Sequence, residues 1–225
     1  MSAGQRDRDP DGAQSVLRER LRTGTLRLDG AMGTALVARG LRGRAPSWNL
    51  SHPSEVLAVH REHVAAGAEL VLTNTLVGAN ADEAAAALRI ARASAAQFVA
   101  ASLYAGLADL ERQIEQLDGV ECLWLETATS AEMAVDAVRR ASGFGLPVVI
   151  TCAMRVAPLE HLRALGAVAA GYNCFPWPDD ASGADVLKLD AAGLRAEAWG
   201  RAVPKARLLG GCCETTGAHL AALFR

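Results

Sequence analysis

The chain has 225 residues, 51% of them hydrophobic and only 4% aromatic, and its formal net charge is −2 at pH 7. This near-neutral balance excludes the strong positive field of a nucleic-acid-binding protein. Membrane-spanning proteins are excluded too, because no apolar run reaches spanning length and the N-terminus is polar rather than like a signal peptide. Five cysteines without secretory features favour reduced thiols in the cytoplasm over a disulfide framework.

The first twelve residues are charged and contain Gly and Pro, so residues 1–12 are predicted to be a disordered tail. The remaining residues, 13–225, are enough for one domain with a substantial core. Ala-rich amphipathic stretches predict helices at 14–21, 55–66, 82–96, 107–117, 131–141, 159–165, 192–199 and 218–224.

Short apolar runs alternate with these helices and predict strands at 26–29, 70–74, 98–103, 122–126, 147–151, 167–172, 185–189 and 206–209. Continuous apolar strands that alternate with helices indicate a buried parallel sheet, and eight of them indicate a (β/α)8 TIM barrel. The helix at 14–21 would cover the bottom of this barrel. A Pro- and Asp-containing loop replaces the helix expected after the sixth strand, so the barrel is predicted to be compact, with at least one helix missing.

The last predicted strand ends in Gly210-Gly211-Cys212-Cys213, which places two adjacent thiols at its C-terminal tip. Neighbouring side chains of a regular strand point to opposite faces, so only a bent tip lets both thiols face one ion. Thiolates suit zinc, and a catalytic zinc site takes three protein ligands and keeps one position open. Cys174, which also closes an apolar run, is the candidate third ligand. The alternative is that these cysteines are small core residues.

Five motifs stand in one order along the chain: Leu28-Asp29-Gly30-Ala31-Met32-Gly33-Thr34; Ala66-Gly67-Ala68-Glu69 leading to Thr73-Asn74-Thr75; Glu126-Thr127; Asn173-Cys174; and Gly210-Gly211-Cys212-Cys213. Together they resemble the zinc-dependent homocysteine S-methyltransferase family. This family includes the betaine- and S-methylmethionine-using enzymes and the homocysteine domain of methionine synthase. The resemblance covers roughly residues 26–222. Family members are usually nearer three hundred residues long, so the resemblance implies a compact member, and a partner that completes the barrel is conceivable.

The resemblance implies that Cys174, Cys212 and Cys213 bind Zn2+. The substrate-binding residues would be Asp29, Ala31, Met32, Gly33, Thr34, Asn74, Glu126 and Thr127, all at predicted strand ends or in the loops that follow them, where a barrel carries its active site. Asp29 and Glu126 would bind the α-ammonium of an amino acid, although carboxylates at strand tips also cap loop amides. The loop from Ala31 to Thr34 would offer backbone N–H groups to the substrate carboxylate, or would be an ordinary turn.

The methyl donors of the family are cationic, and an aromatic face attracts a cation. Trp48 and Trp177, in loops beside the motifs, are therefore candidate donor contacts, with the Asp179-Asp180 pair beside Trp177. The alternative is that both tryptophans pack on the rim of the barrel. His60 and His63 have metal-ligand spacing but no visible third ligand, so helix packing is the preferred interpretation. His219 receives no ligand role, and Cys122 and Cys152 are expected in the core. The alternative for Cys152 is that its thiol, at a strand end, approaches the site.

The expected reaction is methyl transfer from a small cationic donor to the thiolate of homocysteine, which gives methionine. S-methylmethionine or S-adenosylmethionine is favoured as donor, because one domain leaves no room for a folate or corrinoid module. Alternatives are a zinc-binding barrel that binds a thiol amino acid without catalysis, an enzyme that takes methyl from a separate corrinoid protein, and a metallohydrolase on the same fold. The last would need His-rich or carboxylate ligands. A homo-oligomer is possible, and no nucleic acid or membrane is expected as a partner.

Overall fold

The computed structural model describes residues 10–153, 158–174, 177, 181 and 183–225. Eight parallel strands form one sheet in the order β1-β8-β7-β6-β5-β4-β3-β2. The strands are β1 (Leu26–Arg27), β2 (Leu70–Leu72), β3 (Phe98–Tyr104), β4 (Cys122–Ala128), β5 (Val148–Cys152), β6 (Ala167–Cys174), β7 (Val186–Leu189) and β8 (Leu208–Gly211). All eight predicted strands are present. A parallel bridge between Leu28 and Leu70 joins β1 to β2 and closes the barrel, so the predicted compact (β/α)8 fold is confirmed.

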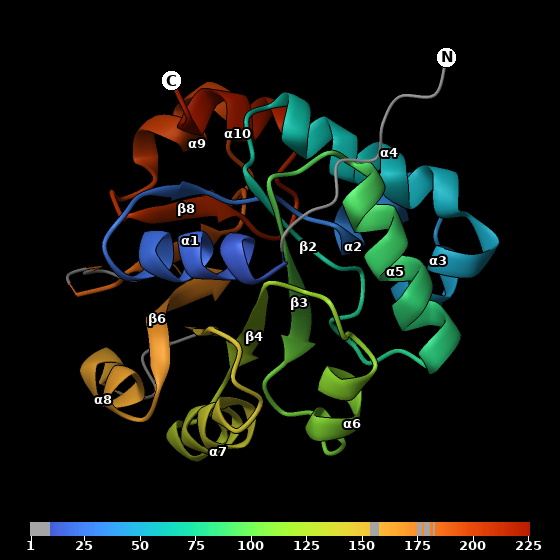
Figure 1. Cartoon of the computed structure of the whole chain (residues 1–225). Coiled ribbons are helices and arrows are strands. Elements are labelled where there is room, and N and C mark those ends of the chain that lie inside the picture. The colour runs from blue at the N-terminus through green and yellow to red at the C-terminus, as the bar shows by residue number, and fades with distance from the viewer. Residues whose placement is uncertain (1–9, 154–157, 175–176, 178–180, 182) are drawn as a thin grey trace.

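Helices surround the strands (Figure 1). They are α1 (Pro10–Arg22), α2 (Gly33–Ala38), α3 (Trp48–Ser51), α4 (Pro53–Ala65), α5 (Ala81–Ala93), α6 (Leu110–Glu115), α7 (Ala131–Ser142), α8 (Leu159–Ala164), α9 (Ala196–Ala202) and α10 (Gly217–Leu223), with a 3-10 turn η1 (Ala45–Ser47). The described residues between β6 and β7 form no helix, as the sequence predicts. The predicted tail falls mostly on residues 1–9, outside the described part, and α1 already begins at Pro10.

The sequence analysis missed three helical segments and placed the starts of α1, α6 and α9 three or four residues away from the observed ones. It predicted no structure for 33–51, where α2, η1 and α3 lie. These segments are four to six residues or a single turn long, and their stability comes from packing of Leu36 and Trp48 against α4 rather than from intrinsic propensity. Helix α9 starts at Ala196 instead of residue 192, because Ala192 and Gly193 both adopt positive φ and turn the chain before the helix.

The inside of the barrel is apolar up to its C-terminal mouth. One buried cluster contains alternate residues of the strands, among them Leu72, Ala100, Trp124, Val149 and Val186, together with Leu17 and Leu21 of α1. Helix α1 therefore covers the bottom of the barrel, as predicted. Side chains two residues further along four of these strands are buried and polar: Ser102, Glu126, Thr151 and Lys188. This polar layer is the floor of the mouth.

Carboxylates bind backbone amides at both ends of the junction between β1 and β2. Glu69 Oε2 accepts a hydrogen bond from Arg27 N at 3.0 Å, and Asp29 Oδ2 accepts one from Leu72 N at 2.8 Å. Strand β1 is only two residues long, so these side chains take the place of ladder hydrogen bonds that longer strands would form. Asp29 thus has a structural partner as well as a place in the mouth.

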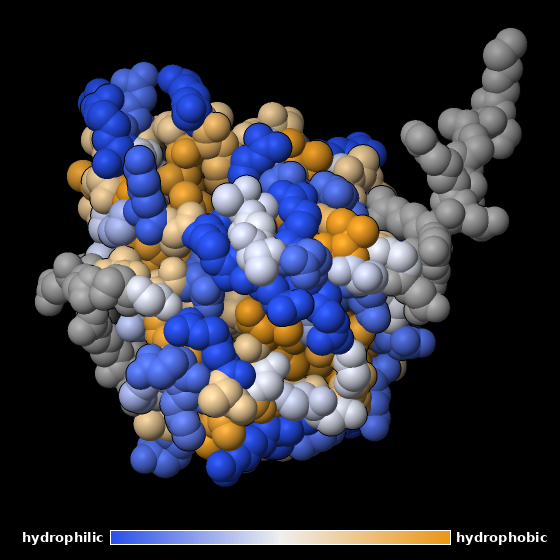
Figure 2. Space-filling model, turned by 60° about the vertical axis from the view of Figure 1, so that its left-hand side comes forward, coloured by the Kyte–Doolittle hydropathy of each residue, from blue (hydrophilic) through white to orange (hydrophobic). Residues whose placement is uncertain are grey.

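On the face shown in Figure 2, hydrophilic and hydrophobic side chains alternate over short distances. Among the described residues, the exposed large apolar side chains are Val16, Val37, Leu50, Val77 and Leu194. None of the described helices is long and apolar enough to span a membrane.

Candidate active site

A cavity of about 540 Å³ opens at the C-terminal ends of the strands. One part of its wall carries charge or thiols: Asp29, Arg44, Glu126, Lys188, Cys212 and Cys213. The other part is apolar and contains Met32, Val37, Leu41, Pro46, Leu72, Leu76 and Val77. A cavity of this size and mixed lining suits a small molecule with a few polar groups.

Three thiols meet at one side of this mouth. Cys174 ends β6, and Cys212 and Cys213 follow β8. The sulfur of Cys174 lies 2.8 Å from that of Cys212 and 3.6 Å from that of Cys213, and all three sulfur atoms lie within 4.8 Å of one another. The structure therefore brings together the three residues that the sequence analysis proposed as metal ligands.

The two glycines before the cysteine pair allow the backbone to pass close to its neighbours. A Cβ atom on Gly210 would lie 2.6 Å from the Asp29 carbonyl oxygen, and one on Gly211 would lie 2.2 Å from Thr215 Oγ1. No larger residue fits either position without movement of the chain. The Thr215 hydroxyl in turn donates to the Cys212 carbonyl oxygen at 2.6 Å, which fixes the bend after β8.

Backbone strain is concentrated around the thiols. Thr127, Cys174 and Glu214 have φ values of 65°, 64° and 62°, in the left-handed region that side-chain-bearing residues rarely adopt. Thr127 is the next-to-last residue of β4, Cys174 ends β6, and Glu214 follows β8. Such conformations cost of order 1–3 kcal/mol and persist where surrounding contacts enforce them, commonly at functional sites.

The thiols influence one another's protonation. Hydrogen bonds from Cys174 and Cys212 hold the pKa of the Cys213 thiol far below its usual value, to about 3. Cys212 shows the opposite effect: its hydrogen bonds with the other two thiols and its burial raise its pKa well above the usual value. Three thiolates this close would repel one another, and a bound cation would offset that repulsion.

Asp29 and Glu126 both lie at the floor of the mouth, and each already has a partner. The Lys188 ammonium forms an ion pair with Asp29 Oδ1, and Ser102 Oγ donates to Glu126 Oε1 at 2.5 Å. Burial raises the pKa of Glu126, although the Lys188 charge opposes this shift. Burial alone would lower the pKa of Lys188, but the carboxylates of Asp29 and Glu126 outweigh it and raise that pKa. Lys188 is therefore an ammonium in this site.

The sequence analysis missed Lys188, which lies in a predicted strand and matches none of the five motifs. The inward direction of Lys188 could have been predicted from the alternation of inward and outward side chains along that strand. Val186 belongs to the barrel interior, so the residue two positions later must point inward as well. A lysine at an inward position of a buried strand is rare without a paired acid.

Asn173 is the second residue whose role was missed, although it stands in a quoted motif. Its side chain donates to Thr127 Oγ1 at 2.9 Å and accepts from Thr127 N at 3.2 Å. The same amide nitrogen lies 4.0 Å from Cys212 Sγ. Asn173 therefore holds the strained Thr127 against β6 beside the thiols, and Thr127 lies close to the site without lining the cavity among the described residues.

The loop after β1 lines the cavity at Ala31, Met32, Gly33 and Thr34. Its first amides are nevertheless occupied by protein groups. Gly30 N donates to His63 Nδ1 at 3.5 Å, and Ala31 N donates to Thr215 Oγ1 at 3.2 Å. Thr34 Oγ1 accepts from Glu214 N at 2.9 Å, which ties the loop to the chain after the cysteines.

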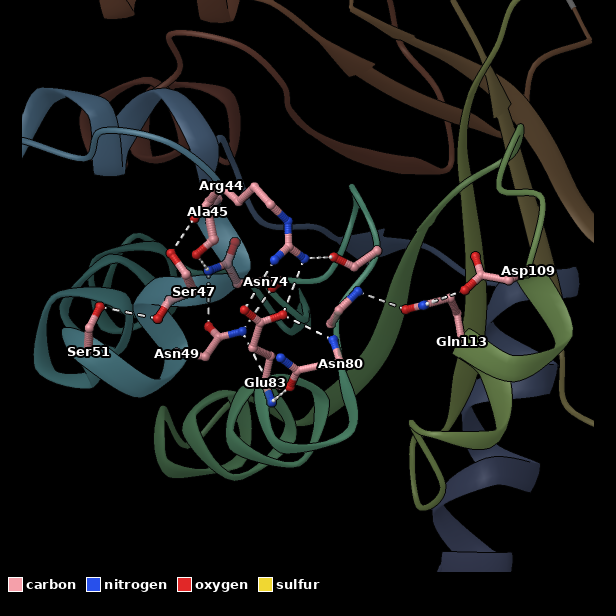
Figure 3. A network of polar contacts seen from close by, with 12 residues as sticks. Arg44, Ala45, Ser47, Asn49, Ser51, Asn74, Asn80, Glu83, Asp109 and Gln113 are labelled. Carbon is pink, nitrogen blue, oxygen red and sulfur yellow. Dashed lines mark hydrogen bonds and ion pairs between the residues drawn. The ribbon is translucent and has the colours of Figure 1, made fainter.

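Asn74 lines the cavity, but its amide group faces the chain that covers β2 (Figure 3). Its Nδ2 donates to the Ala45 carbonyl oxygen at 2.8 Å and to Asn49 Oδ1 at 3.0 Å. Asn49 donates back to the Asn74 carbonyl oxygen at 3.0 Å, and Arg44 closes the same network through an ion pair with Glu83. Asn74 thus positions the cavity wall, and both of its amide hydrogens have protein acceptors.

Neither tryptophan lines the cavity within the part of the chain that is described. Trp48 is buried among Leu36, Val56 and Val59, and its ring stacks on His52 with centroids 4.3 Å apart. Trp177 Nε1 donates to Asp190 Oδ1 at 2.7 Å. Both positions match the packing alternative better than direct contact with a donor. The Asp179-Asp180 pair lies outside the described residues.

The remaining histidines and cysteines lie where the sequence analysis placed them. His60 and His63 are buried on the inner face of α4 and belong to no metal-binding group of described residues. His219 caps α10 through Thr216. Cys122 and Cys152 are buried, and burial raises the pKa of Cys152 to about 12.

A strand-end cysteine cluster facing buried acids at the mouth of a barrel agrees with the resemblance noted from the sequence. The model of a family described as homocysteine S-methyltransferase matches residues 26–225. The chain belongs to this family. It is therefore an enzyme of the homocysteine S-methyltransferase class. No curated protein matches it by sequence.

Solved structures agree with this family fold. The metallated form of the homocysteine methyltransferase MmuM from Escherichia coli has a TM-score of 0.72 and 22% identity, and the match covers 92% of this chain and 98% of that one. The apo form of the same protein gives 0.71 and 22%, over 90% and 96%. Type I 3-dehydroquinate dehydratase from Clostridium difficile gives only 0.52 and 11%, over 90% and 93%. At these identities the similarity shows the fold alone.

Proposed function

We propose that this enzyme transfers a methyl group from a small sulfonium compound to the thiolate sulfur of homocysteine, with Zn2+ held by Cys174, Cys212 and Cys213. The observation that carries the proposal is the convergence of three thiols beside a cavity lined by buried acids and a buried ammonium. The family supplies the acceptor, and the geometry of the thiols supports the metal.

The thiol cluster fits a zinc ion after a small adjustment. Tetrahedral ligands at about 2.3 Å from zinc place neighbouring sulfur atoms about 3.8 Å apart. The 3.6 Å separation of Cys174 and Cys213 is near this value, whereas the 2.8 Å separation of Cys174 and Cys212 must widen by about 1 Å. Cys174 and Cys212 lie at chain bends, so such a movement requires no rearrangement of the strands.

When bound, zinc would lower the pKa of the acceptor thiol, so that the thiolate is available at neutral pH. The chain itself would bind and orient the amino acid through Glu126 and its neighbours at the floor of the mouth. The apolar wall around Met32, Leu72 and Leu76 would exclude water from the sulfur. In the reaction, a carbon–sulfur bond of the sulfonium breaks as the new methyl–sulfur bond of methionine forms. The donor leaves as a neutral thioether, and no proton moves at the methyl carbon.

The volume of the cavity supports a small donor, because about 540 Å³ accommodates an amino acid and a second small molecule together. Among the described residues, neither Trp48 nor Trp177 lines the cavity, so these rings do not support the donor assignment. The assignment depends instead on the size of the cavity and on the apolar part of its wall. S-methylmethionine is placed ahead of S-adenosylmethionine because the latter adds a nucleoside to the same cavity.

The test supplies homocysteine with one donor at a time and measures methionine. The donors are S-methylmethionine, S-adenosylmethionine, betaine and a methylated corrinoid protein. The Cys212→Ala variant, prepared in the same way, is the control without a complete metal site. Methionine formed only with a sulfonium supports the proposal. Methionine formed only with betaine or the corrinoid protein overturns the donor, and no methionine with any donor favours a barrel that binds thiols without catalysis.

A further inference from the structure

The floor of the mouth contains a buried lysine that the proposed reaction does not yet use. Lys188 on β7 is only 2% exposed, and it is in register with Asn173 of β6 and Gly210 of β8. It lies two residues after Val186 of the barrel interior, so its side chain emerges above the apolar core and lines the cavity.

Lys188 forms an ion pair with Asp29, the carboxylate that the sequence resemblance assigned to the ammonium of the substrate. Its ammonium pairs with Asp29 Oδ1, and Asp29 Oδ2 already accepts from Leu72 N at 2.8 Å. Both oxygens of Asp29 therefore have protein donors, and its charge is balanced within the chain. A substrate ammonium placed at Asp29 would be repelled by the ammonium of Lys188.

The Lys188 ammonium has more hydrogen-bond donors than the described residues give it acceptors. An ammonium carries three N–H donors, and Asp29 is the one hydrogen-bond acceptor that the described residues give it. Buried donors without acceptors are costly, and those of a charged group more so. Since Lys188 lines the cavity, an oxygen atom of a bound ligand is the group that can satisfy them.

The other groups of the cavity wall that could bind a substrate carboxylate are less available than Lys188. In the loop after β1, the amides of Gly30 and Ala31 are bound to His63 and Thr215, which leaves only the uncharged amides of Met32 to Thr34 for a ligand. Arg44 is the other cation in the cavity wall, and it pairs with Glu83 and donates to the Gly78 carbonyl oxygen at 2.7 Å. Lys188 is therefore the best-placed cation for an anionic group of a ligand.

Glu126 complements this arrangement. One of its oxygens accepts from Ser102, and the hydrogen bonds of the described residues include none to the other. Because Lys188 is paired with Asp29, Glu126 is the buried acid of the cavity wall without an ion-pair partner among the described residues, and a ligand ammonium would stabilise its charged form. The floor of the mouth thus offers one cation and one anion, which matches the two charged groups of an α-amino acid.

We infer that Lys188 binds the α-carboxylate of the thiol acceptor, that Glu126 binds its α-ammonium, and that Asp29 holds Lys188 in position rather than contacting the substrate. This inference rests on the proposed function, because it concerns the acceptor of the same reaction. It changes the role of Asp29 from a substrate contact to a positioning residue, and it makes Lys188 a determinant of acceptor specificity.

The experiment compares three thiols that differ only in their charged groups. Homocysteine has both groups, 4-mercaptobutanoate lacks the ammonium, and 3-aminopropane-1-thiol lacks the carboxylate. Dissociation constants are measured by calorimetry on the zinc-loaded wild type, Lys188→Met and Glu126→Gln. We expect Lys188→Met to weaken homocysteine and 4-mercaptobutanoate by about 10- to 100-fold and to change 3-aminopropane-1-thiol by less than about 3-fold. Glu126→Gln should weaken homocysteine and 3-aminopropane-1-thiol instead.

Two results would overturn the inference. Tighter homocysteine binding by Lys188→Met would mean that the lysine only competes with the substrate ammonium for Asp29. Equal weakening of all three thiols would mean a structural role. Because Lys188→Met leaves a buried carboxylate without its partner, the double variant Lys188→Met/Asp29→Asn is measured alongside it and should show the same selective loss of carboxylate recognition.

The wild type provides a test that needs no variant, because removal of the carboxylate from the ligand must itself weaken binding by about 10-fold or more. These binding measurements also separate the inference from the proposed function. The predicted pattern without methyl transfer from any donor would contradict the function but not the role of Lys188. Methyl transfer to homocysteine without the pattern would contradict only the role of Lys188.

Discussion

At the scale of single residues, the metal assignment can be tested at Cys212, whose sulfur lies 2.8 Å from that of Cys174 and within 4.8 Å of that of Cys213. The variant Cys212→Ala removes one of three ligands and should reduce bound zinc from about one ion per chain to well below half, because two thiolates are a poor zinc site. Metal analysis of the purified protein checks this.

Cys152→Ala is the matched control, because Cys152 is also a strand-end cysteine but lies outside the thiol cluster. It should keep its zinc. Full occupancy in Cys212→Ala would remove Cys212 from the ligand set, and an equal loss in Cys152→Ala would attribute the effect to damaged folding.

Single residues also show where reading the sequence succeeds and where it does not. The cysteines were predictable because two adjacent thiols at a bent strand tip suit a shared metal ion better than a core, and their separation in sequence from Cys174 does not matter once strand ends converge. Lys188 was not singled out, since a lone lysine in a strand carries no motif and its partner, Asp29, is 159 positions away. Trp48 was given a possible donor role because exposure cannot be read from residue type, and packing against α4 buries it.

At the scale of elements, α4 carries two histidines on its buried face. His60 is fully buried, and among the described side chains no hydrogen-bond partner reaches either of its ring nitrogens. Burial lowers the pKa of His60 to about 4. In the unfolded chain the same group titrates near 6.5, so only the unfolded state gains a proton between these values. The folded state is therefore destabilised as the pH falls.

We expect the free energy of unfolding to be highest above pH 6.5 and to decrease by about 3 kcal/mol from His60 alone as the pH falls to 4. His60→Leu should flatten this dependence, which urea denaturation at several pH values measures. His161→Leu, which removes an exposed histidine from α8, is the control and should leave the slope unchanged. An unaltered slope in His60→Leu would mean that His60 takes up protons in the folded state as well.

Elements differ in how far the sequence determines them. The eight strands were predictable, because nearly all are short apolar runs with both faces buried, as in β2, β5 and β7. Strand β1, in which Arg27 is exposed, is the exception. Helices α2 and α3 were not, because segments of six and four residues gain their stability from contacts with α4 and not from their own sequence. The sequence therefore indicated the barrel itself better than the chain that covers its mouth.

At the scale of the whole molecule, the thiol cluster connects distant parts of the chain. Cys174 lies on β6 and the other two thiols follow β8, so a bound ion ties these strands together at the mouth. An ion that binds only the folded state stabilises it by about 4 kcal/mol at a thousand times its dissociation constant. We expect a chelator to lower the melting temperature of the zinc-loaded protein by about 8 °C or more.

Cys212→Ala serves as the control for this experiment, because its melting temperature should not respond to the chelator. Differential scanning calorimetry with and without the chelator measures both proteins. A shift of the same size in the variant would show that the chelator acts at another place, and no shift in the wild type would show that the ion adds nothing to stability.

Asp29 belongs to the closure of the barrel as much as to its mouth. Its carboxylate binds the amide of Leu72 across the short junction of β1 and β2, and it also holds Lys188 on the far side of β8. The Asp29 side chain therefore both joins β1 to β2 and positions Lys188. Replacement of Asp29 during evolution would therefore weaken the sheet at its shortest strand, β1, whatever its effect on the choice of acceptor substrate. Divergence of substrate choice should instead begin at Glu126, whose side chain makes no hydrogen bond to the described residues of this junction, whereas replacement of Lys188 must also compensate the buried charge of Asp29.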